Sequence, residues 1–282
     1  MKKVKRSDLT DTAEHQQEHQ TEVTAQAGEH FGVGTIVSDT FATFFKNWFS
    51  FSSIAVLVYL PIVLAMVAIF GFDITNPEAF AAADPSVLVI TIIATSIVSM
   101  LSLAVMMAAI SYGAIEDQAG SRATFGDMLV VGLKNFIPVI AAMVLTTVLY
   151  MLGLVLLVVP GIIVMVMLSV TTQVIVAEGK GPIDAMKRSA ELTSGYKWPV
   201  FGALIVVYIV TQIAVSLLNI PLSLMSLGAA TEESIWSISL LVSAILGAVS
   251  YAIYASCGAS IYTGLRRVKE GVSSEEIAKV FA

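Results

Sequence analysis

The sequence is short of charge. Only 13% of its 282 residues are Asp, Glu, Lys or Arg, whereas about a quarter of the residues in a soluble domain are charged. In their place 57% of the residues are hydrophobic, and the mean hydropathy is +0.86. This composition excludes an ordinary soluble domain and predicts an integral membrane protein. The net charge of −6 and the absence of a basic patch also exclude a nucleic-acid binder.

Cysteine and histidine are nearly absent. The single cysteine, Cys257, lies in an apolar run, which excludes an intrachain disulfide and a cysteine metal site. His15 and His19, with Glu18 between them, match the inverted zinc-protease pattern. They lie in a polar tail, 1–30, that we predict to be disordered and that has few apolar residues to enclose a metal. We therefore predict no metal, cofactor or catalytic site.

Long apolar runs fill the rest of the chain. Each approaches or exceeds the roughly 20 residues that a helix needs to cross about 30 Å of hydrocarbon. The sequence predicts an all-α fold, a polytopic transmembrane bundle of six helices in three hairpins. The six runs are Ser52–Phe72, Val87–Ile110, Phe136–Val159, Gly161–Ala177, Pro199–Asn219 and Ser237–Tyr262. The third and fourth are joined at Val159-Pro160-Gly161, which predicts a tight turn there.

Basic residues are missing from every second connection between these runs. All 15 Lys and Arg residues flank the same side: five before the first run, two after the second, four after the fourth and four after the sixth. In the opposite connections every charged residue is acidic. These residues are Asp73, Glu78, Asp84, Glu232 and Glu233. Since basic residues mark the cytoplasmic side, both termini are expected in the cytoplasm.

A weak internal repeat precedes three of the runs. In each copy an amphipathic stretch leads to a lysine beside an aromatic residue and then into the apolar run. The copies end at Lys46-Asn47-Trp48, Lys134-Asn135-Phe136 and Lys197-Trp198. Apolar residues three and four positions apart share one helical face, and lysine with an aromatic residue marks the headgroup level. We expect three cytoplasmic interfacial helices.

One segment resembles a known family. The run from Glu178 to Leu192 opens with Glu-Gly, carries Ala-x-x-Arg-Ser at 185–189 and follows Pro160-Gly161. This arrangement resembles the bacterial six-helix membrane proteins grouped as the glycerophosphoryl diester phosphodiesterase membrane domain. The resemblance covers residues 31–264 and implies a membrane domain of the bacterial inner membrane. Some relatives carry an additional phosphodiesterase barrel. No barrel sequence is present here, so we do not expect their enzymatic activity.

Four cations lie close together in the connection after the fourth run: Lys180, Lys187, Arg188 and Lys197. One interpretation is an interfacial helix that only orients the chain. The other is a site for anionic lipid headgroups, each basic residue contributing about 1 kcal/mol near the surface. Glu178, Asp184 and Glu191 lie among these cations and would neutralise part of their field.

Small residues recur at every fourth position of the sixth run. This row favours close helix packing, within the chain or against a partner. Its members are Ala244, Ala248, Ala252, Ser256, Ser260 and Gly264. The remaining residues, 265–282, are expected to form a cytoplasmic tail with a short amphipathic helix, because Ser273 and Glu276 resemble a capping box.

The apolar runs contain no charged residue, which disfavours an ion-coupled transporter. The buried polar residues, such as Gln173 and Gln212, are expected to bond across helices. Two functional hypotheses remain. The first is a non-enzymatic scaffold or accessory protein, in contact with membrane lipids and with a membrane protein partner or further copies of itself. The second is an uncoupled carrier or flippase-like handler of lipids or other amphiphiles. An intramembrane enzyme is a more distant alternative, because the acidic pair Glu116-Asp117 has no histidine or serine constellation nearby in the sequence.

Overall fold

The computed structural model describes residues 31–70, 85–228 and 233–271. Every regular element in these ranges is a helix. In chain order they are α2 (Val33–Lys46), α3 (Trp48–Phe70), α5 (Pro85–Gln118), α6 (Phe125–Leu156), α7 (Val158–Met167), α8 (Thr171–Glu178), α9 (Pro182–Thr193), α10 (Lys197–Gly228) and α11 (Glu233–Glu270). The predicted all-α class is therefore confirmed.

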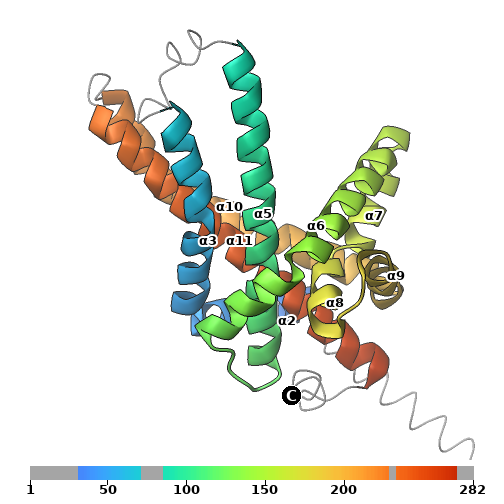
Figure 1. Cartoon of the computed structure of the whole chain (residues 1–282). Coiled ribbons are helices and arrows are strands. Elements are labelled where there is room, and N and C mark those ends of the chain that lie inside the picture. Colours follow the sequence, from blue (N-terminus) through green and yellow to red (C-terminus); the bar gives the residue numbers. More distant parts are fainter. Residues whose placement is uncertain (1–30, 71–84, 229–232, 272–282) are drawn as a thin grey trace, which may run out of the picture.

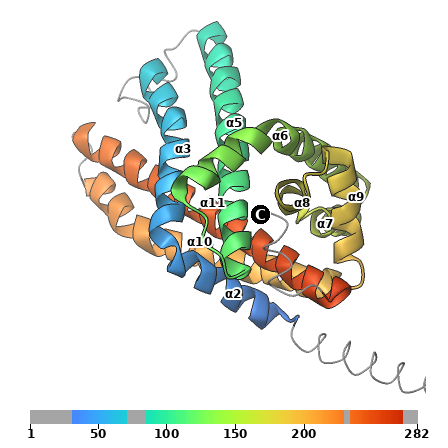
Figure 2. The same cartoon turned by 60° about the horizontal axis from the view of Figure 1, so that its bottom comes forward.

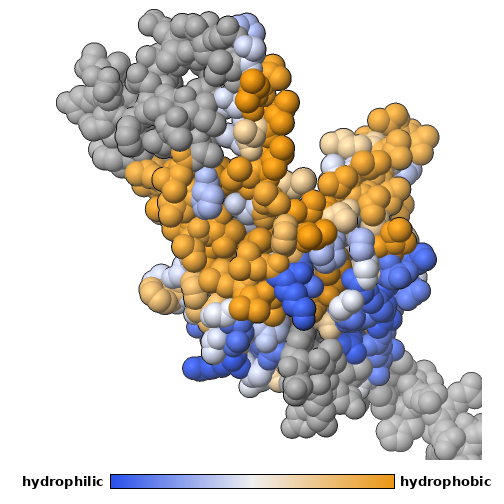
Figure 3. All heavy atoms as spheres, in the orientation of Figure 1, coloured by the Kyte–Doolittle hydropathy of each residue, from blue (hydrophilic) through white to orange (hydrophobic). Residues whose placement is uncertain are grey.

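Several of these helices are long and apolar enough to cross a membrane. In the described ranges, five segments qualify: Leu88–Gln118, Phe125–Leu156, Val158–Glu178, Lys197–Pro221 and Leu241–Glu270. The pair α2 and α3 gives a sixth if it is counted as one broken span. The chain is a multi-pass membrane protein. Figure 3 shows the matching surface, apolar over most of its height and polar at one end, where α9 and the end of α11 lie.

A sharp bend separates α2 from α3. The two helices meet at 80° around Asn47, whose side-chain amide donates to the carbonyl of Thr43 at 3.1 Å. The amphipathic stretch before Lys46 is thus a helix of its own, and α9 is another, starting at Pro182 after Gly181. Proline suits this first position because its missing N–H would have no helical partner.

The second predicted interfacial helix is not separate. Helix α6 runs without interruption from Phe125 to Leu156, and Pro138 lies inside it. Its start is fixed by a capping box in which Thr124 and Asp127 bond each other's backbone N–H. Asn135, where we expected a boundary, donates instead to the carbonyl of Val131 within the same helix at 2.9 Å.

The turn between α6 and α7 also differs from the prediction. It lies at Leu157, the one residue with extended backbone between the two helices, and Pro160 falls in the first turn of α7. Two glycines allow the hairpin to close, since a Cβ on Gly153 would lie only 2.8 Å from the Cα of Gly161. The sequence therefore correctly predicts a turn here, but the turn lies at Leu157, three residues before Pro160.

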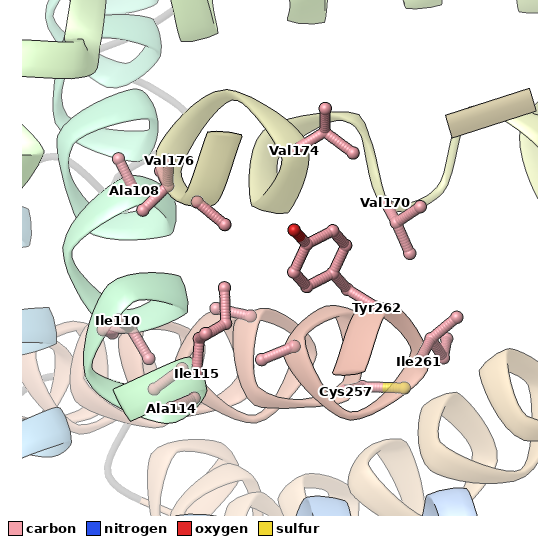
Figure 4. Packing of buried hydrophobic residues seen from close by; sticks show 14 of the residues in the cluster. Ala108, Ile110, Ala114, Ile115, Val170, Val174, Val176, Cys257, Ile261 and Tyr262 are labelled. Atoms are coloured by element: carbon pink, nitrogen blue, oxygen red, sulfur yellow. The ribbon is translucent and has the colours of Figure 1, made fainter. Parts of the chain in front are cut away.

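Helix α11 is the centre of the fold. It packs against α2 and α3 on one side, α8 and α9 on another, and also against α5 and α10, as Figures 1 and 2 show. Figure 4 shows part of this core, where the buried ring of Tyr262 points from α11 toward α8, and Ile110 and Ile115 of α5 are also buried. Many buried residues here are alanines, which let the backbones approach closely.

Two of the predicted segments lie outside the described residues. They are the polar tail 1–30, with His15 and His19, and the amphipathic helix expected around Ser273 and Glu276. Both stay predictions.

The glycine contact between α5 and α6 can be tested by adding one methyl group. A Cβ on Gly132 would lie 2.7 Å from the backbone oxygen of Val105, so we expect Gly132→Ala to lower the free energy of unfolding by about 1–3 kcal/mol. Gly247→Ala in α11 is the control, because nothing lies within 4 Å of its added Cβ. It should be neutral or stabilise by up to about 1 kcal/mol. Unfolding by SDS titration measures both, and equal effects would contradict the packing.

Candidate functional site

Glu178, at the end of α8, is the centre of an ion-pair network. Its carboxylate accepts hydrogen bonds from the hydroxyl of Tyr262 at 3.2 Å and from Nε of Arg188 at 3.3 Å. Nζ of Lys180 lies 2.7 Å from its other oxygen. The chain can turn back toward Glu178 because Gly179 adopts the left-handed conformation, with φ of 63°, which glycine tolerates best.

The network continues into the last turns of α11. Arg188 also pairs with Glu270, and Glu270 accepts from Nε of Arg266 at 2.8 Å. Arg266 in turn lies within hydrogen-bond distance, 3.4 Å, of the Tyr262 hydroxyl. Burial lowers the pKa of Arg188, but its bonds to Glu270 and Glu178 outweigh this and hold the pKa above the ordinary value. This network therefore clamps α8, α9 and α11 together.

The four predicted headgroup cations do not share one environment. Lys180 and Arg188 belong to the network around Glu178. Lys187 pairs with Asp184 at 3.4 Å, on a surface where their side chains are 70% and 72% exposed. Lys197 has no ion-pair partner among the described residues. Among the described residues, two of the four cations therefore belong to a structural network, a third is in a solvated pair, and Lys197 has no ion-pair partner.

Lys197 lines a small apolar pocket between α7 and the first turns of α10, here called the α7–α10 pocket. Its volume is about 280 Å³. Trp198, which also lines it, is 81% exposed and packs edge-on against Phe201 with ring centroids 6.2 Å apart. The complete lining is Val159, Ile162, Ile163, Val166, Lys197, Trp198 and Phe201. A charged amine at the edge of an apolar pocket matches the two parts of an anionic amphiphile.

A second polar cluster, which sequence reasoning missed, joins α2, α5 and α11. The side-chain amide of Gln118 donates to the hydroxyls of Thr43 at 3.1 Å and Ser260 at 2.7 Å, and its oxygen accepts from Thr263. Nearby, Lys46 pairs with Asp117 at 2.7 Å. The available signal was the acidic pair Glu116-Asp117 followed by Gln118, which lies beyond the second predicted run, Val87–Ile110, whereas α5 continues through it.

The row of small residues on α11 faces the protein interior. Ala248, Ala252, Ser256 and Ser260 are buried, while Ala244 and Gly264 are half-buried. The neighbours of α11 are helices of the same chain. Gly264 contacts Phe31 so closely that a Cβ there would lie 2.6 Å from the ring.

Gln173, in the fourth predicted span, is almost completely buried. Its amide donates to Ser111 at 3.1 Å, and its oxygen has no hydrogen-bond partner among the described residues. Room for this side chain exists because position 258 is glycine, whose added Cβ would collide with the amide. Gln212 accepts from the hydroxyl of Tyr254 at 3.5 Å. Among the described residues no three His, Cys, Asp or Glu side chains are grouped to hold a metal.

Comparison with known families gives one match. The sequence model of a family described as "Domain of unknown function (DUF7847)" matches residues 80–265. The chain belongs to this family. The DUF7847 range begins just before α5 and ends five residues short of the end of α11, so it contains Glu178, Arg188 and Tyr262. Helices α2 and α3 precede it.

No curated protein and no solved structure matches this DUF7847 member. The resemblance to the glycerophosphoryl diester phosphodiesterase membrane domain is separate from the DUF7847 match and stays a prediction.

Replacing Glu178 should weaken the contact between α8, α9 and α11. Glu178→Gln keeps the shape of the side chain but removes the charge that pairs with Arg188 and Lys180. Since the Glu178 side chain is only 14% exposed, we expect a loss of about 1–3 kcal/mol of unfolding free energy. Asp184→Asn, which breaks the exposed pair with Lys187, should cost at most about 0.5 kcal/mol. SDS titration of both variants measures these losses of unfolding free energy. Equal losses in the two variants would contradict a structural role of the network.

Proposed function

We propose that this protein is a non-enzymatic membrane scaffold or accessory protein that holds anionic lipid at its cytoplasmic surface. The observation that carries this proposal is the position of Lys197. Of the four predicted headgroup cations it is the one without a carboxylate partner among the described residues, and it borders the apolar α7–α10 pocket. The other three cations are paired, so the lipid-binding role falls on Lys197.

The proposed topology has six spans in three hairpins with both termini in the cytoplasm of a bacterial cell. Its support is the pairing of consecutive helices, α3 with α5, α6 with α7, and α10 with α11. The distribution of all 15 basic residues supports the orientation. In this arrangement α2 and α9 lie at the cytoplasmic interface, which suits two amphipathic helices separate from the apolar spans.

Uncoupled transport of an amphiphile is the second candidate, and one observation favours it. Figure 3 shows an apolar groove that opens between α5 and the hairpin of α6 and α7. Beyond Ala142 the only buried residue of α6 is Gly153, which faces Gly161 of α7, so the distal part of this hairpin packs on itself. A carrier moves bound lipid between leaflets whereas a scaffold does not, and dithionite quenching of fluorescent lipid in proteoliposomes separates the two.

The lipid proposal predicts a specific effect of Lys197→Gln. Removing this charge should reduce the retention of phosphatidylglycerol about fivefold, because one basic residue near the surface contributes about 1 kcal/mol. Native mass spectrometry of protein released from phosphatidylglycerol-containing vesicles measures the bound fraction. Lys187→Gln is the matched control, since it removes an exposed charge from α9 and should leave retention unchanged. An equal reduction in both variants would assign the effect to general surface charge.

The proposed orientation can be tested with single cysteines in a Cys257→Ala background. Ser194, between α9 and α10, and Ser86, at the start of α5, are both exposed. We expect Ser86→Cys to react with a membrane-impermeant maleimide in intact cells, and Ser194→Cys to react only after the membrane is opened. The reverse pattern, or reaction of both in intact cells, would overturn the orientation.

A further inference from the structure

A second and larger pocket lies between the start of α2 and the end of α11, here called the α2–α11 pocket. Its volume is about 450 Å³, within the range of about 300–1,000 Å³ typical of small-molecule sites. It shares no lining residue with the α7–α10 pocket. The residues used below are Phe31, Thr35, Ile36 and Asp39 on the α2 side, and Arg267 and Val268 on α11.

The pocket carries one charge of each sign. Asp39 and Arg267 both line it. Burial raises the pKa of Asp39 above its ordinary value, and the charge of Arg267 opposes this shift. No ion pair within 4 Å joins them, and Asp39 has no hydrogen bond to any other described residue. One N–H of Arg267 donates to the backbone oxygen of Gln118 at 3.3 Å. A guanidinium has five such donors, so most remain for a ligand.

Most of the remaining lining is apolar and held in place, and Thr35 and Ser260 are its other polar members. Phe31 is buried and packs edge-on against Tyr196, with ring centroids 5.3 Å apart. Gly264 lies directly against the Phe31 ring, and Ile36 is buried beside it. This wall is therefore set by contacts with α11 and with the residue preceding α10, before any ligand binds.

In the proposed topology the pocket lies at the cytoplasmic interface. Helix α2 ends at Lys46, next to Trp48, a lysine and an aromatic residue of the type that marks the membrane interface. The last turn of α11 carries Arg267 and Lys269. In that topology a ligand in the pocket would lie at headgroup level.

We propose that the α2–α11 pocket binds a zwitterionic amphiphile, with its ammonium at Asp39, its phosphate at Arg267 and its apolar part against Phe31, Ile36 and Val268. A purely anionic ligand would be repelled by Asp39, and a purely cationic one by Arg267. A molecule that carries both charges satisfies both side chains without leaving either unpaired. Phosphatidylethanolamine has this chemistry, and free phosphoethanolamine shares its headgroup. The site is distinct from the proposed one at Lys197 and does not depend on it.

The test uses the full chain in vesicles that contain equal parts of phosphatidylethanolamine and phosphatidylglycerol, with the retained lipid read by native mass spectrometry. We expect the wild type to retain phosphatidylethanolamine. In Asp39→Asn the preference for phosphatidylethanolamine over phosphatidylglycerol should fall about tenfold, because a charge-assisted hydrogen bond is lost. Arg267→Gln should weaken retention of phosphatidylethanolamine and should not create a preference for phosphatidylglycerol. Asp184→Asn and Lys187→Gln, which remove exposed charges of α9, should leave the ratio unchanged.

A third variant guards against loss of fold. Thr35→Trp places a bulky side chain at the exposed edge of the pocket and should abolish retention of phosphatidylethanolamine while both charges stay. Thermal melting identifies any variant that does not fold. The proposal is overturned if the wild type shows no preference for phosphatidylethanolamine, or if Asp39→Asn and Thr35→Trp fold and behave like the two controls. Competition with free phosphoethanolamine identifies the source: displacement assigns the site to the soluble headgroup, and persistence assigns it to the lipid.

Discussion

The close approach of α11 to its neighbours is the contact on which the rest of the structure depends. Inside a membrane, helices gain little from burying apolar surface, so they must gain from dispersion contacts and hydrogen bonds at short range. The small side chains Ala248, Ala252 and Ser256 are all buried on α11. Their size allows α5 and α2 to come near enough for Gln118 to bond Ser260 and Thr43. Larger residues in this row would separate the same polar groups.

The polar end of the molecule illustrates why a count of basic residues is a poor guide to binding. Lys180 and Arg188 face Glu178, and Arg266 faces Glu270, so these cations are used to fasten helices. What remains available is defined by position: Lys197 at the α7–α10 pocket and Arg267 at the α2–α11 pocket. At both proposed lipid contacts a cation lies beside apolar residues and has no acidic partner within ion-pair distance among the described residues.

The sequence predicts the class of fold well, because long apolar runs have few alternatives to membrane helices. Gly181-Pro182 is a local signal that agrees with the structure, because it breaks one helix and suits the start of α9. The sequence is wrong about two boundaries. Asn135 was expected at a boundary but donates to Val131 within α6. Residues 116–118 stay helical in α5, where Asp117 pairs with Lys46 and Gln118 bonds Thr43 and Ser260. These partners lie on α2 and α11, far away in the chain, so the local sequence could not show them.

The position of α2 has a consequence for biosynthesis. This helix is made first among the described elements, yet it packs mainly against α11, which begins at Glu233. About 190 residues separate the two, which at 5–20 residues per second is roughly 10–40 s of translation. Through that interval α2 has none of its α11 contacts, and the bend at Asn47 lets it wait along the membrane surface while α3 inserts. Until α11 is made, the face of α2 that later packs on α11 can be covered by the membrane surface alone.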